Sequence, residues 1–271
     1  MIQSMEAANT LFSGEHGTKT LVYDGSFNGF LTAVFVGYEQ KLVHADIQAG
    51  RNVQRGLFTE TETVFTNIEI AKRVWSGIQA KSSEAIKNIY FAFLSEQTGM
   101  EPLLYRYIRK VMGSTADRTA DLGDDAILKI RQWSQKVSRE KHRMEAFVRF
   151  QLTKDNIYFA QIEPDYDVLP LLSKHFRSRF ADQEWIIYDA ARNYGLYYNR
   201  SSVEIIGLDL QEDFSNRIKR NGTLADVEHD YQELWRQYFK STHIKARINK
   251  KLHQQHVPKR YWKYLSEKKV G

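Results

Sequence analysis

The chain has 271 residues, 42% of them hydrophobic, and a net charge of +6, so it can bury a sizeable core and favours an anionic partner such as nucleic acid. The absence of cysteine excludes disulfides, thiolate zinc sites and cysteine-bound iron–sulfur clusters, and we expect no cofactor in this chain. No apolar run approaches the about 20 residues of a membrane helix and no signal-peptide pattern is seen, so we expect a cytoplasmic protein without membrane contact.

The first half of the chain, residues 1–145, is predicted to be a mainly helical lobe with short N-terminal strands. A strand over 21–23 ends at a turn signal, and apolar residues at helical spacing over 27–36 predict the next helix. Thr66 and Glu69 have the spacing of a capping box at the start of a further helix.

A long helix is expected to open at Asp124, after which the hydrophobic period changes. Alternating apolar and polar residues predict β-hairpins over 147–163 and 185–198, separated by a helix over 167–180. Because a hairpin pairs its strands antiparallel, the sequence predicts an α+β fold with an antiparallel sheet over about residues 147–208.

The second half, residues 146–271, is therefore expected to combine this sheet with basic C-terminal helices, although the whole chain could also form one compact unit. Residues 243–254 are predicted to form a basic helix that Pro258 ends. A last turn or short helix is expected over 259–266.

The C-terminal segment from Arg236 to Gly271 contains eleven lysines and arginines and one acidic residue, Glu267. Cations neutralise phosphates and aromatic rings stack on unpaired bases, so this mixture suits single-stranded or distorted nucleic acid. The alternative is a solvated basic helix with Trp262 in the core. The predicted nucleic-acid contacts of this segment are Lys245, Arg247, Asn249, Lys250, Lys251, Arg260, Tyr261 and Trp262.

A second group of predicted contacts lies at the step from the long helix into the sheet. Arg143 and Arg149 could bind phosphate bidentately there. An ion pair with Glu140, Glu145 or Glu163 explains these two arginines equally well.

A third group surrounds the second hairpin, where Arg179 and Arg192 are predicted contacts. Asp189 and Arg192 lie near the hairpin turn, and a buried ion pair that fixes the turn is the alternative to a functional role. His175 lies on the apolar side of its helix, where a hydrogen-bonded core histidine is more common than a catalytic one.

No complete catalytic signature is found in the sequence. The turn at Asp24-Gly25-Ser26 lacks the lysine and the spacing of a P-loop, and neither a G-x-S-x-G elbow nor an H-E-x-x-H helix occurs. His253 and His256 supply only two possible ligands, so we expect no metal site and leave the catalytic residues unassigned.

A set of motifs runs along nearly the whole chain. They are Tyr23-Asp24-Gly25-Ser26-Phe27-x-Gly29, His142-Arg143-Met144, Phe147-x-Arg149-Phe150, His175-Phe176 to Arg179, Trp185-x-Ile187-Tyr188-Asp189, Ile244-x-x-Arg247-x-Asn249 and Pro258-x-Arg260-Tyr261-Trp262. In combination they resemble a family of uncharacterised bacterial domains described as DNA metabolism proteins. The resemblance implies a setting beside a radical SAM protein of DNA modification or repair, and a similar domain is fused to a uracil-DNA glycosylase-like domain. It implies no catalytic residues.

The leading hypothesis is a DNA-binding accessory protein that presents a substrate to a radical SAM partner. With no cysteine in this chain, the partner must hold any iron–sulfur cluster. The first alternative is a nucleic-acid-processing enzyme that uses groups such as Asp24, His142, His175 or Asp189. The second is a protein-interaction subunit whose basic face meets an acidic partner.

Overall fold

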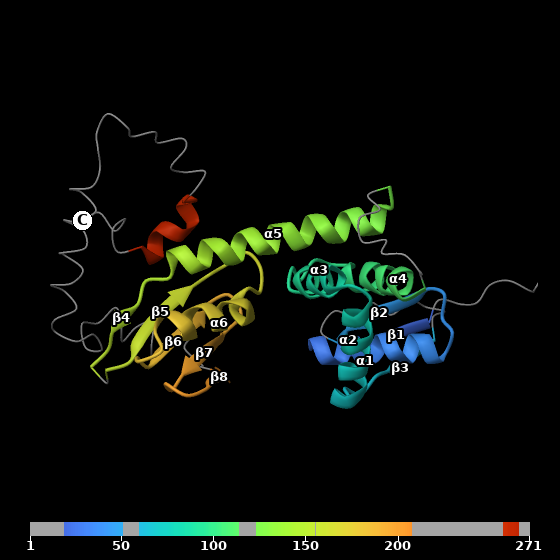
Figure 1. Ribbon diagram of the computed structural model, residues 1–271, viewed down its shortest axis with the longest axis horizontal. Helices are drawn as coiled ribbons and strands as arrows, with labels where there is room; N and C mark the ends of the chain where they lie inside the picture. The colour runs from blue at the N-terminus through green and yellow to red at the C-terminus, as the bar shows by residue number, and fades with distance from the viewer. Residues whose placement is uncertain (1–18, 51–59, 114–122, 155, 208–256, 266–271) are drawn as a thin grey trace, which may run out of the picture. The chain divides into compact units, whose positions relative to one another are not determined.

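The computed structural model describes residues 19–50, 60–113, 123–154, 156–207 and 257–265. The chain divides into two compact units, Met1–Gln135 and Lys136–Gly271. Each unit combines helices with its own sheet, so the α+β class expected from the sequence is confirmed (Figure 1). Among the described residues, no helix is both long enough and apolar enough to cross a bilayer.

The first unit contains a three-stranded parallel sheet with the strand order β2-β1-β3. Its elements are β1 (Lys19–Tyr23), α1 (Phe27–Glu39), β2 (Ala45–Ala49), β3 (Thr61–Thr63), α2 (Ile68–Lys81), α3 (Ser83–Phe93) and α4 (Met100–Gly113). The predicted strand at 21–23 and helix at 27–36 are confirmed. The apolar faces of these elements form one core that contains Phe30, Leu31, Ile47, Leu104 and Ile108.

The start of α2 differs from the sequence prediction by one residue. Asn67 caps α2 by accepting hydrogen bonds from the amides of Glu69 and Ile70, so the capping box predicted at Thr66 is wrong by one residue. Thr66 instead donates its hydroxyl to Asp24 at 2.7 Å. Because the hydroxyl of Thr66 is bonded to Asp24, the neighbouring Asn67 caps the helix.

Helix α5 (Asp125–Phe147) begins in the first unit and ends in the second. Asp124 accepts hydrogen bonds from the amides of Ala126 and Ile127, which confirms it as the residue that opens the long helix. The other described elements of the second unit are β4 (Gln151–Leu152), β5 (Tyr158–Ile162), α6 (Leu169–Arg179), β6 (Trp185–Asp189), β7 (Tyr194–Tyr198), β8 (Val203–Ile206) and the 3₁₀ helix η3 (Lys259–Tyr264).

The five strands of the second unit form one sheet in the order β4-β5-β6-β7-β8. Both predicted hairpins, β4–β5 and β6–β7, are confirmed as antiparallel pairs. The sheet as a whole is mixed and not antiparallel, because β5 and β6 pair in parallel. From β5 the chain passes through α6 and enters β6 at the end of the sheet where β5 began. Parallel neighbouring strands require such a crossover connection.

The core of the second unit lies between α6 and the sheet (Figure 1). Trp185 of β6 is fully buried, and its ring lies 6.2 Å from that of Phe176 on α6 and 6.3 Å from that of Phe150. This packing turns the opposite face of α6 outward. The predicted basic helix over 243–254 lies outside the described residues.

Candidate anion-binding site

A buried carboxylate, that of Glu140 on α5, gathers several of the predicted nucleic-acid contacts. Glu140 is 1% exposed. Its Oε2 lies 3.3 Å from Nη1 of Arg143 and 3.5 Å from Nη2 of Arg260, while its Oε1 accepts hydrogen bonds from the backbone amide of Asp165 and the hydroxyl of Tyr261. Because a buried carboxylate is stable only when it is paired, Arg143 and Arg260 neutralise Glu140.

The residues of η3 are committed to the same cluster. Arg260 also pairs with Asp165, and its guanidinium lies 4.6 Å from the ring centroid of Tyr261. Burial, followed by the hydrogen bond to Glu140, raises the pKa of Tyr261, so its hydroxyl stays protonated and donates. Tyr261 is 2% exposed, so its ring has no free face on which a base could stack.

The turn between β6 and β7 is fixed by Asp189, which is completely buried. Its Oδ1 accepts hydrogen bonds from the amides of Ala191 and Arg192, and its Oδ2 lies 3.0 Å from Nη1 of Arg192. The same Nη1 donates to the carbonyl oxygen of Pro164 at 3.2 Å. The arrangement is the buried ion pair that the sequence offered as the alternative to a functional role.

The other described contact residues, Arg149, Trp262 and Arg179, make contacts other than those with Glu140 or are exposed. Arg149 donates to the carbonyl oxygens of Ala146 and Val148, which lie at the end of α5 where helix carbonyls lack partners within the helix. Trp262 is half-buried and donates its Nε1 to the carbonyl oxygen of Val257. Arg179 is exposed at the end of α6. The predicted contacts Lys245, Arg247, Asn249, Lys250 and Lys251 lie outside the described residues.

The described catalytic candidates are Asp24 in the first unit and His142, His175 and Asp189 in the second. Asp24 belongs to the first unit and accepts hydrogen bonds from Ser26 and Thr66. His142 and His175 each place Nδ1 within 3.8 Å of a carboxylate oxygen of Glu145. In the part of the chain that the structure describes, no group of three or more histidines, aspartates and glutamates could hold a metal ion.

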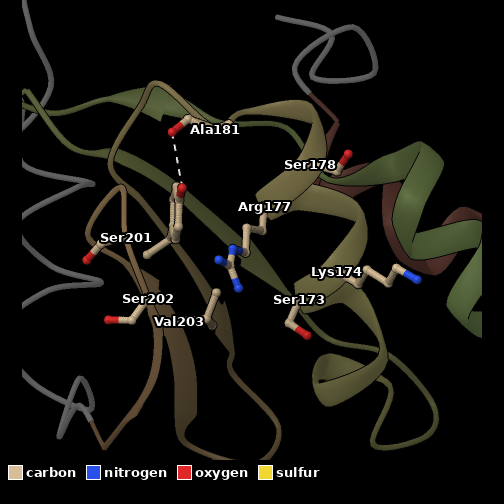
Figure 2. Close-up of a pocket in the computed structure, with 9 residues that line it drawn as sticks. Ser173, Lys174, Arg177, Ser178, Ala181, Ser201, Ser202 and Val203 are labelled. Carbon is tan, nitrogen blue, oxygen red and sulfur yellow. Dashed lines mark hydrogen bonds between the residues drawn. The ribbon is translucent and has the colours of Figure 1, made fainter.

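A pocket of about 760 Å³ lies on the second unit, between α6 and the turn that joins β7 to β8. Its lining residues are Ser173, Lys174, Arg177, Ser178, Ala181, Tyr198, Ser201, Ser202 and Val203. Figure 2 shows Arg177 reaching from α6 toward Val203, with Ser173 beside it. We call this the α6 pocket.

The α6 pocket is cationic. Lys174 and Arg177 are exposed, and neither forms an ion pair or hydrogen bond with a described residue. None of the lining side chains is acidic. Neither residue was among the contacts predicted from the sequence, although the run Ser173–Arg179 holds three cations and no acid.

The fold and these contacts define a class: a two-unit α+β protein whose second unit pairs arginines with acids and leaves a cationic pocket open. Within that class, the chain belongs to the family described as Domain of unknown function (DUF4130), whose model matches residues 98–267. No curated protein matches the chain. The family is thus established, and its description assigns no activity.

Proposed function

We propose that this protein is a cytoplasmic DNA-binding accessory protein in DNA repair or modification. The observation that carries the proposal is the outer face of α6, where Lys174, Arg177 and Arg179 are exposed in a helix without a single acid. The net charge of +6 and the resemblance to DNA metabolism proteins support it. Exposed cations without acidic partners are what binding to a phosphate backbone requires.

The enzyme alternative has less support. The carboxylate of Asp24 is occupied by hydrogen bonds from Ser26 and Thr66, and that of Asp189 is buried against Arg192. Neither is poised as a free general base in a cleft. The protein-interaction alternative keeps the same cationic face but gives it an acidic protein as its partner.

The intact protein is expected to bind a labelled oligothymidine strand, and its affinity should fall steeply with salt. Each phosphate that the protein neutralises should lower the logarithm of the binding constant by about 0.7 per tenfold rise in salt. Fluorescence anisotropy over a series of salt concentrations measures this slope. Absence of binding at micromolar concentrations in low salt would contradict the proposal and favour the protein-interaction alternative.

The proposed partner is a radical SAM protein that holds its own iron–sulfur cluster. The family resemblance motivates this partner, and the absence of cysteine in this chain requires that the partner supply the thiolates. Co-expression of the two proteins followed by affinity purification through a tag on this chain should recover both. Recovery of this chain alone, with the partner soluble in the same lysate, would contradict a stable complex.

A further inference from the structure

We propose that the α6 pocket binds the phosphate group of a phosphate ester, with Arg177 as its principal ligand. This assignment rests on the proposed function and names the chemical group that the cationic face would hold. The phosphate could belong to a nucleic-acid strand or to a free nucleotide, which share the same chemistry at this pocket.

The guanidinium of Arg177 has no ion-pair partner among the residues that the structure describes. Several other arginines of the second unit face acids: Arg143 pairs with Glu140, Arg192 with Asp189 and Arg200 with Glu184. Arg177 projects into a pocket without an acid within the described part of the chain. A guanidinium in such a position can donate two parallel hydrogen bonds to phosphate oxygens.

The pocket is rich in hydroxyl groups. Four of its nine lining residues are serines, two on α6 and two on the β7–β8 turn. Serine hydroxyls rotate to suit an anion and donate to its oxygens. Three of these hydroxyls donate within the protein: that of Ser173 to the carbonyl oxygen of Pro170, that of Ser201 to Asn199, and that of Ser202 to Asn199 and Glu204. A phosphate would therefore draw these donors from their present acceptors, and Arg177 remains its principal ligand.

The wall of the pocket formed by the β7–β8 turn is held by hydrogen bonds. The side chain of Asn199 accepts hydrogen bonds from the amides of Ser201 and Ser202 at 3.0 and 2.8 Å, which fixes the turn. Tyr198 donates its hydroxyl to the carbonyl oxygen of Ala181 at 3.1 Å and so links the strand to the end of α6 (Figure 2). A pre-ordered wall reduces the entropy that binding must overcome.

An ordinary structural explanation of the same cations makes a different prediction. Arg177 and Arg179 lie in the last turn of α6, where positive charge favours the helix dipole. If that were their only role, replacing Arg177 would lower thermal stability slightly and leave every affinity for phosphate compounds unchanged.

The test uses the full chain and three probes: inorganic phosphate, thymidine 5′-phosphate and an oligothymidine strand. Binding is measured by isothermal titration calorimetry for the wild type, Arg177→Gln and the control Arg106→Gln. Arg106 is an exposed arginine of α4, so the control removes the same charge from the first unit. Arg177→Gln should weaken the probes that bind by roughly tenfold, while Arg106→Gln should leave them within about twofold. Melting temperatures confirm that each variant is folded.

The outcomes separate the pocket from the proposed function. Loss of affinity for all three probes supports a phosphate-ester site open to free nucleotides, and loss for the strand alone supports a site for a strand phosphate. If the strand binds but Arg177→Gln matches Arg106→Gln, the pocket assignment is overturned and DNA binding stands. If the small phosphates bind through Arg177 but the strand does not, the pocket stands and the proposed function is overturned. Binding of no probe overturns both.

Discussion

Replacing Glu140 with alanine is expected to destabilise the second unit by about 3 kcal/mol, the lower end of the cost of breaking a buried ion pair. The substitution removes the acceptor for Tyr261 and for the backbone amide of Asp165. It also leaves Arg143 and Arg260 without their shared carboxylate. We place the cost at the lower end because both arginines are partly exposed and can be solvated by water.

Chemical denaturation of the full chain, followed by circular dichroism, measures this loss. Glu69→Ala is the matched control, since Glu69 is an acid with 80% of its side chain exposed, and it should change stability by less than about 0.5 kcal/mol. Glu140→Gln should cost less than Glu140→Ala because the amide keeps an acceptor for Tyr261. A Glu140→Ala protein as stable as the Glu69→Ala protein would show that the cluster does not hold η3 in place.

Replacing Gly29 with alanine is expected to destabilise the first unit by about 1–3 kcal/mol, the usual cost of overpacking. A Cβ atom at Gly29 would lie 2.3 Å from Oδ1 of Asp24 and 2.7 Å from Oγ1 of Thr66. Both atoms belong to short side chains that are already hydrogen-bonded, so neither can move away cheaply. The motif that carries the family resemblance in this region is thus explained by packing around Asp24.

Gly77 of α2 provides the control for this substitution. A Cβ there would meet only Cε of Met112, at 3.6 Å. Gly77→Ala should therefore stabilise the helix by up to about 1 kcal/mol, the difference in helix propensity. Thermal melting of both variants measures the two effects, and a shift of the same sign for both would contradict the packing argument.

The local periodicities of the sequence were sufficient for most elements. Helical and alternating spacing predicted α1, α5 and α6 and both hairpins. The parallel pairing of β5 with β6 was not predictable from these patterns, because alternation specifies a strand and leaves its neighbours in the sheet undetermined. The short strands β2 and β3 were missed, and β3 has only three residues over which an alternating pattern could show.

The candidate site was less accessible to sequence reasoning because charge alone does not reveal a partner. Arg260 stands in a basic segment, yet it pairs with Asp165, which lies far away in the chain. Glu140 was considered only as one ion-pair partner of Arg143 or Arg149, and its contact with Tyr261 depends on tertiary structure. Arg177 was missed because the local sequence does not show which cations lack an acidic partner in the folded protein.

The salt dependence of DNA binding by a double variant tests the central claim most directly. In Lys174→Ala/Arg177→Ala, the slope of the logarithm of the binding constant for the oligothymidine strand against the logarithm of salt concentration should become shallower by about 1.4, or about 0.7 for each lost phosphate contact. The control Lys72→Ala/Arg106→Ala removes two exposed charges from the first unit and should keep the wild-type slope. A slope for the α6 double variant equal to that of the wild type would contradict the account, because DNA would then not be held by α6.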